Sequence, residues 1–179
     1  MSAYFVEGKV YFYTGRKGSG KTLTIVKDAI NYKANGWTVY SNFKIEGVSL
    51  ISNKDILELD KKSDIRDCVL VVDEIQVLFD SRKSMKSENV SFSNFLQQIR
   101  KRGIILLCST QYSGTVDLRL RQHVDVEVKP KYYKEYGVCE AIYTDLNTID
   151  DYNPYPEQVS VAFFGRDVFC KYDTRETIV

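Results

Sequence analysis

The chain has 179 residues, of which 44% are hydrophobic and 27% are charged, as in one soluble globular domain. Its 25 basic and 24 acidic residues nearly cancel, which excludes a basic field over the whole surface and leaves only a local patch to bind nucleic acid. The start lacks the apolar core of a signal peptide, and no apolar run approaches the ~20 residues that span a bilayer, so we expect a soluble, cytoplasmic protein.

The first elements alternate between strand and helix. Residues 9–14 are aromatic and β-branched and predict a strand, which a glycine-rich turn follows. Residues 21–34 place apolar side chains at helical spacing, and Asn35-Gly36 has the glycine expected after a helix end. Residues 37–43 predict a second strand, and Asn53 is the expected N-cap of a short helix.

Two continuously apolar runs, residues 68–72 and 104–108, predict strands buried on both faces, as in a parallel sheet. The polar segment 80–91 between them predicts a loop. Residues 92–102 carry apolar side chains at helical spacing and basic residues in the last turn, and Gly103 ends this helix. The four cysteines (Cys68, Cys108, Cys139 and Cys170) form no CxxC motif and are expected to be buried, reduced thiols.

After a short helix predicted at 116–122, the sequence pattern becomes typical of strands separated by turns. Residues 126–133 and 138–146 are expected to pair, and Gly165-Arg166 suits the type II′ turn of a further hairpin. We therefore predict one domain over residues 1–179. Its α/β core, about 9–128, has a mainly parallel sheet between helices, and an antiparallel β-hairpin extension covers about 129–179.

The glycine-rich turn matches the phosphate-binding pattern GxxxxGK[ST], with a strand before it and a helix after it. Chance occurrence over this length is on the order of one in a hundred. Lys21 would bind the β- and γ-phosphates of ATP, and the Thr22 hydroxyl would ligate Mg²⁺. The nucleotide-binding residues predicted are Gly15, Arg16, Lys17, Gly18, Ser19, Gly20, Lys21 and Thr22.

Two adjacent carboxylates, Asp73 and Glu74, end the buried strand 68–72. Asp73 would hold Mg²⁺, and Glu74 would polarise the attacking water as general base. The alternative is a pair of solvated acids at a strand end. With the phosphate-binding pattern present, hydrolysis is favoured over phosphoryl transfer to an acceptor, so we predict an ATPase.

Gln111 follows the apolar strand 104–108. Its side chain could reach the γ-phosphate or the attacking water, which makes it a third catalytic candidate beside Glu74 and Lys21. The alternative is a loop glutamine that is hydrogen-bonded locally.

Basic residues provide two further sets of candidates. An arginine that reaches a neighbouring subunit's nucleotide would stabilise the transferring phosphoryl group, against the alternative of ordinary solvated helix-end charge. The candidates are Arg100, Arg102, Arg119 and Arg121. Arg82, Lys83 and Lys86 could touch a DNA backbone, and a solvated loop is an equal alternative for them.

Four runs carry a family resemblance: Val-Val-Asp-Glu-Ile at 71–75, residues 95–104, Cys-Ser-Thr-Gln at 108–111, and the ending 169–176. With the phosphate-binding pattern, they resemble the FtsK/HerA superfamily of DNA-pumping ATPases, and within it viral genome-packaging and zonula occludens toxin-like ATPases. The resemblance implies a RecA-like core of the additional-strand, catalytic-glutamate type, with the Gln111 strand between the other two site strands. It also implies that Gln111 is the sensor of a hexameric ring that holds ATP between subunits and DNA in its pore.

The leading hypothesis is therefore an ATP-driven motor that packages viral double-stranded DNA in the host cytoplasm, with a capsid or vertex protein as a further candidate partner. A second hypothesis is an ATPase for phage-type virion assembly or extrusion that acts on protein. A third, a small-molecule kinase, gives Glu74 no role.

Overall fold

The computed structural model describes residues 8–62, 64–78, 95–110, 122–149 and 153–173. Within them the strands form a single sheet in the order β3-β2-β4-β5-β1-β6-β7-β8. The strands are β1 (Val10–Thr14), β2 (Val39–Ser41), β3 (Ser49–Leu50), β4 (Val69–Val72), β5 (Ile105–Thr110), β6 (Val126–Tyr133), β7 (Val138–Asp145) and β8 (Glu157–Phe164). The helices are α1 (Lys21–Ala34), α2 (Asn53–Leu57), α5 (Arg166–Phe169) and the 3₁₀ turns η1 (Leu59–Lys61), η2 (Ile75–Val77) and η3 (Leu146–Thr148); residues 95–101 are also helical.

The strands from β3 to β6 in this order are parallel. This confirms the predicted mainly parallel sheet, and β5 lies between β1 and β4 as the resemblance implies. Because parallel strands end at the same edge, Thr14, Val72 and Thr110 bring their following residues to one edge of the sheet. That edge is where ligands bind in open α/β sheets.

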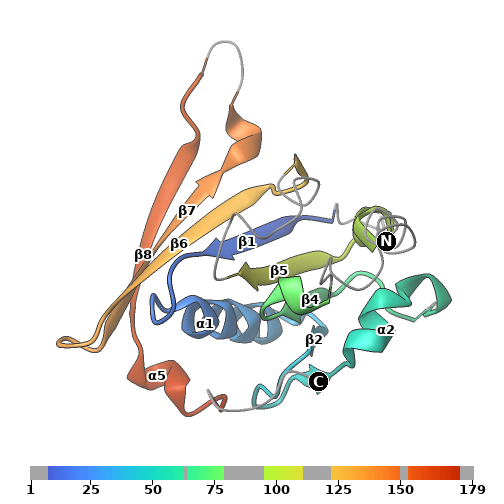
Figure 1. Cartoon of the computed structure of the whole chain (residues 1–179), viewed down its shortest axis with the longest axis horizontal. Helices are drawn as coiled ribbons and strands as arrows, with labels where there is room; N and C mark the ends of the chain where they lie inside the picture. The colour runs from blue at the N-terminus through green and yellow to red at the C-terminus, as the bar shows by residue number, and fades with distance from the viewer. Residues whose placement is uncertain (1–7, 63, 79–94, 111–121, 150–152, 174–179) are drawn as a thin grey trace.

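Helices cover both faces of the sheet, so each central strand is apolar on both sides. Along β4, Val69 and Val71 face the core under α1, whereas Leu70 and Val72 face the core that contains Ile56 of α2. The same alternation runs along β1 and β5. It explains why the sequence shows continuous apolar runs here and not the polar alternation of a half-exposed strand. In Figure 1, α1 runs along one face of β1 and β5.

The last three strands extend the sheet as an antiparallel ribbon. β6 pairs parallel with β1 over Tyr11–Tyr13 and antiparallel with β7 along its full length. β7 in turn pairs with all of β8. The predicted pairing of 126–133 with 138–146 is confirmed. β6 itself is continuous across residue 128, where the predicted core was expected to end (Figure 1).

The predicted II′ hairpin at Gly165-Arg166 is wrong. Gly165 has a right-handed helical φ of −61°, and the chain enters α5 instead of a strand. Val168 of α5 is buried in the core under α1, so burial of this side chain outweighs a turn that would have exposed it. Tyr172 makes only an isolated β-bridge, with Ile45, in place of the expected strand.

Smaller details also differ from the sequence prediction. The N-cap of α2 is Ser52, whose hydroxyl accepts a hydrogen bond from the Asp55 N–H at 3.1 Å, and Asn53 is the first helical residue. β2 is shorter than the predicted strand 37–43. Cys170 is exposed, whereas the other three cysteines are buried as expected. The segment 80–91 and most of the predicted helix 116–122 lie outside the described residues.

Across the described part of the chain, no helix is both long and apolar enough to cross a membrane.

Candidate nucleotide site

The phosphate-binding pattern forms a loop between the end of β1 and the start of α1. Gly15, Gly18 and Gly20 have φ values of 144°, 80° and 98°, which residues with a side chain rarely adopt. Gly20 also has no room for a side chain, because a Cβ there would lie 2.9 Å from the Cys139 sulfur and 3.3 Å from the Tyr132 Cβ. The loop is therefore packed directly on β6 and β7.

Lys21 and Thr22 are the first residues of α1, where backbone N–H groups and the helix dipole favour an anion. The Lys21 ammonium folds over the loop and donates to the carbonyl oxygens of Gly15 at 2.8 Å and Arg16 at 3.1 Å. Burial lowers the pKa of Lys21, and the charges of Asp73 and Glu74 act in the opposite direction. The ammonium thus lies between the loop and the two acids.

Asp73 joins the loop to the end of β4. The Thr22 hydroxyl donates to Asp73 Oδ2 at 2.9 Å, across 51 residues of sequence. The other carboxylate oxygen, Oδ1, accepts from the Ser109 hydroxyl of β5 and from the Glu74 N–H at 3.2 Å. Three adjacent segments thereby converge on one carboxylate at the carboxyl edge of the sheet.

Asn42, directly after β2, holds the backbone of Asp73 from the other side. Its amide oxygen accepts from the Asp73 N–H at 2.9 Å, and its amide nitrogen donates to the Asp73 carbonyl at 3.3 Å. The same nitrogen donates to Asn53 Oδ1 at 3.3 Å. Asn42 is 1% exposed, so this clamp is shielded from competing water.

Glu74 turns the chain sharply out of β4. It adopts the left-handed conformation, with φ 52° and ψ 56°, which costs a non-glycine residue free energy and requires support from its surroundings. Its N–H donates to Ser109 Oγ at 3.0 Å, which supplies that support. Ser109 therefore orients Asp73 and Glu74 together.

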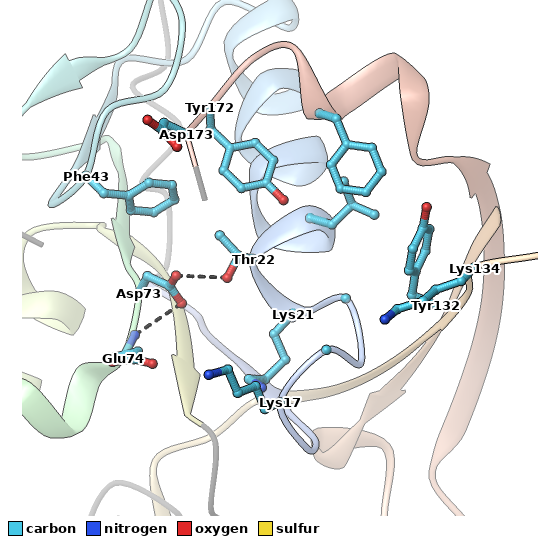
Figure 2. Close-up of a pocket in the computed structure, with 14 residues that line it drawn as sticks. Lys17, Lys21, Thr22, Phe43, Asp73, Glu74, Tyr132, Lys134, Tyr172 and Asp173 are labelled. Atoms are coloured by element: carbon cyan, nitrogen blue, oxygen red, sulfur yellow. Dashed lines mark hydrogen bonds between the residues drawn. The ribbon is translucent and has the colours of Figure 1, made fainter. Parts of the chain in front are cut away.

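The loop, the start of α1 and the two acids line one cavity of about 450 Å³. Lys17 and Lys21 come from the loop, Asp73 and Glu74 from the end of β4, and Tyr132 from β6. Phe43, Lys134, Phe169, Tyr172 and Asp173 complete the wall on the side of the C-terminal segment. Figure 2 shows Thr22 and Lys21 in the middle, the two acids on one side and Tyr132 with Lys134 on the other.

The cavity suits a phosphate chain with Mg²⁺. Ser19 Oγ in the loop is buried and has no hydrogen-bond partner among the described residues, and a phosphate oxygen would provide one. Thr22 and Asp73 present two hard oxygen ligands side by side. The described residues hold no group of three or more His, Cys, Asp or Glu that could bind a metal ion.

The remaining predicted residues are placed as follows. Arg100 pairs with Asp125 at 3.3 Å, beside the amino end of β1. Arg102 donates to Gln98 at 2.8 Å and to the carbonyl groups of Lys62 and Ile65. Outside the described residues lie Gln111, Arg119, Arg121, Arg82, Lys83 and Lys86.

Several site residues were not predicted from the sequence. Ser109 stands two positions before Gln111 in the same polar strand end, so the sequence signal at this strand end was present but only Gln111 was predicted from it. Asn42 and Tyr132 carry no local motif, and only the pairing of β2 and β6 with distant strands brings Asn42 to Asp73 and Tyr132 to the cavity.

The site has a glycine-rich loop between a strand and a helix, and the carboxylate that follows a second strand contacts the threonine at the start of that helix. This arrangement defines a P-loop ATPase. The family model described as "ATPase family associated with various cellular activities (AAA)" matches residues 11–132, which is more than half of the chain, and the protein belongs to that family. No curated protein sequence is similar enough to match.

Three solved structures illustrate the fold. The N-terminal domain of zonular occludens toxin from Neisseria meningitidis is 22% identical, with TM-score 0.64, over 93% of this chain and 100% of that chain. The genome packaging NTPase B204 from Sulfolobus turreted icosahedral virus 2, in complex with AMP, is 17% identical, with TM-score 0.58, over 78% of this chain and 93% of that chain. A DnaB-like replicative helicase is 11% identical, with TM-score 0.56, over 89% of this chain and 56% of that chain. At these identities the likeness shows the fold.

Proposed function

We propose that this ATPase is a motor that couples ATP hydrolysis to movement of double-stranded DNA, and that it packages a viral genome. The observation that carries the hydrolytic part is the contact of Thr22 with Asp73, with Glu74 fixed beside it through Ser109. The DNA part is supported by the resemblance at residues 71–75 and 95–104 and by fold neighbours whose names include a genome packaging NTPase and a replicative helicase.

The chain's own groups divide the chemistry among them. The loop N–H groups and Lys21 bind the phosphate oxygens. To do so, the Lys21 ammonium replaces its hydrogen bonds to the Gly15 and Arg16 carbonyl oxygens with bonds to phosphate. Thr22 and Asp73 would hold Mg²⁺, which would neutralise phosphate charge. Glu74 accepts a proton from the attacking water, and its rigid turn holds the carboxylate in place.

A second copy is expected to complete the site. We propose a homo-oligomeric ring, a hexamer by the family resemblance, in which an arginine of the neighbouring copy reaches the nucleotide. Arg100 and Arg102 both use hydrogen bonds within their own chain, so either would have to exchange these bonds to act in trans. Arg119 and Arg121 remain candidates for this role from the sequence.

The second candidate function is movement of protein during virion assembly or extrusion. The observation that favours it is the fold match to the zonular occludens toxin domain, which spans all of that chain and 93% of this one. The same nucleotide site would serve either function, so only the response to the moved substrate separates them.

The deciding experiment measures phosphate release with and without linear duplex DNA over a salt series. A DNA motor is expected to hydrolyse ATP several-fold faster with DNA at low salt, and the stimulation should fade as salt rises because the phosphate contacts are screened. Identical rates with and without DNA at low salt would contradict the DNA proposal and favour a protein substrate. Steady phosphate release without an acceptor would exclude the kinase.

A further inference from the structure

The nucleotide cavity has an aromatic end that the phosphate chemistry does not use. Tyr132 of β6 and Phe169 of α5 meet there edge to face, with ring centroids 5.7 Å apart and planes at 83°. Both rings line the same cavity as Lys21 and Thr22. In Figure 2, Tyr132 and Lys134 lie on the opposite side of the loop from Asp73 and Glu74.

The position of the phosphates determines what reaches this end. Lys21, Thr22 and Asp73 would hold the terminal phosphates and Mg²⁺, so the rest of the nucleotide must extend away from Asp73. The loop itself leads to the aromatic end, because Gly20 lies so near Tyr132 that a Cβ added to the glycine would be 3.3 Å from the Tyr132 Cβ. A nucleoside is the part of the ligand that would lie against these rings.

We propose that Tyr132 and Phe169 form a platform for the nucleobase and that the chain after β8 builds one wall of the nucleotide site. This inference rests on the proposed ATPase function and adds to it the residues that contact the base. A purine has a larger π face than a pyrimidine and stacks on aromatic side chains more strongly.

The segment of residues 165–173 makes several contacts with the residues that follow β2 on the other side of the cavity. Lys171 pairs with Glu46 at 2.7 Å, and the Glu46 N–H donates to the Lys171 carbonyl at 2.8 Å. Tyr172 forms the β-bridge to Ile45 and packs edge to face on Phe43, with centroids 6.4 Å apart. These contacts tie Lys171 and Tyr172 to the residues after β2, so the wall is part of the folded domain.

Tyr172 supplies a polar group to that wall. Burial, together with the Asp73 charge, raises the pKa of Tyr172 to about 12, so its hydroxyl stays protonated at neutral pH and can donate to a ligand oxygen. In Figure 2 this hydroxyl points into the cavity above Thr22. The segment therefore contributes an aromatic surface at the base end and a hydrogen-bond donor nearer the phosphates.

The test compares two ligands that differ in the base. Isothermal titration calorimetry with Mg²⁺ measures binding of a non-hydrolysable ATP analogue and of inorganic tripolyphosphate to the wild-type protein, Tyr132→Leu and Phe169→Leu. Each variant is expected to bind the ATP analogue on the order of tenfold more weakly, the loss typical of one aromatic stacking contact, and to bind tripolyphosphate like the wild type.

The matched control is Tyr136→Leu. Tyr136 is 73% exposed in the turn between β6 and β7 and does not line the cavity, so both ligands should bind unchanged. Lys21→Ala should weaken both ligands, because it removes a phosphate contact. Phe169→Tyr should retain analogue binding, and thermal melting checks that each variant is folded.

The wild-type protein gives a test that needs no substitution. A cytidine triphosphate analogue should bind several-fold more weakly than the adenosine one, and this gap should shrink in Tyr132→Leu. The base platform is wrong if both leucine variants keep wild-type affinity for the ATP analogue, or if they lose tripolyphosphate to the same extent. If the wild-type protein binds neither ligand, the proposed ATPase function fails and the platform with it.

Discussion

At the scale of single residues, the site depends on how one carboxylate is held. Asp73 receives hydrogen bonds from Thr22, Ser109 and the Glu74 backbone, and Asn42 grips its main chain. Each donor comes from a different part of the sequence, so the carboxylate is oriented before any ligand binds. Such preorganisation is how enzymes stabilise developing charge without a reorganisation cost.

Ser109→Ala tests this arrangement. The hydroxyl is fully buried, and its loss leaves the Glu74 N–H without one acceptor and Asp73 without one donor, which should lower stability by about 1–3 kcal/mol and slow ATP hydrolysis. Chemical denaturation and phosphate release measure the two effects. Ser160→Ala is the control, since the Ser160 hydroxyl also bonds a carboxylate, Glu140, but on an exposed surface; an equal loss there would contradict the argument.

Glu74→Gln tests the assigned general base. The amide keeps the size of the side chain but cannot accept the proton, so nucleotide binding should persist while turnover falls at least ~100-fold. Steady-state phosphate release and equilibrium binding separate the two. Glu135→Gln, in the exposed turn after β6, should behave like the wild type. Normal hydrolysis by Glu74→Gln would assign the base elsewhere.

At the scale of elements, helix α1 is joined to the sheet by a buried carboxylate. Asp28 of α1 accepts from the hydroxyls of Tyr13 in β1 and Tyr143 in β7, each at 2.7 Å, and pairs with Lys27 at 3.0 Å. Burial, with the Asp28 charge, raises the pKa of both tyrosines, so these hydroxyls remain donors at neutral pH. The helix that starts at the phosphate loop is therefore fixed to the antiparallel ribbon as well as to the parallel core.

Tyr143→Phe should loosen this joint. It removes one partly buried hydrogen bond to a charged group, at a cost of about 1.5–3 kcal/mol, which corresponds to a fall of several degrees in melting temperature. Tyr133→Phe, which removes a hydroxyl bond to Glu140 on the ribbon, should cost less, because that bond is longer, at 3.2 Å, and Glu140 is less buried than Asp28. Thermal melts of the two variants give the comparison. An equal fall in melting temperature would show that the hydrogen bond to Asp28 stabilises the fold no more than the bond to Glu140 does.

The C-terminal elements show where local patterns fail. Gly165-Arg166 satisfies the local rule for a hairpin, yet the chain forms α5 because Val168 is buried under α1 and Phe169 packs on Tyr132. In contrast, the strands 68–72 and 104–108 and the helix 21–34 were predicted closely, since a strand buried on both faces and a helix with an apolar stripe leave strong local patterns.

At the scale of the whole molecule, the proposed ring makes activity depend on association. If a neighbour's arginine completes each site, the turnover per subunit should rise with protein concentration until the ring has formed. Phosphate release over a dilution series, beside a mass measurement of the assembly, tests this. A constant turnover in a range where the mass is that of one chain would contradict the shared site.

The sequence by itself determined the phosphate loop, the acids that follow a buried strand and the order of alternating strands and helices, because each leaves a short-range pattern. Only the tertiary structure decided that Ser109 and Asn42 hold Asp73, and that Tyr132 packs against Phe169 at one end of the cavity. These contacts join segments far apart in the chain. They follow from how the strands pair and which side chains the core buries, and no local spacing records either.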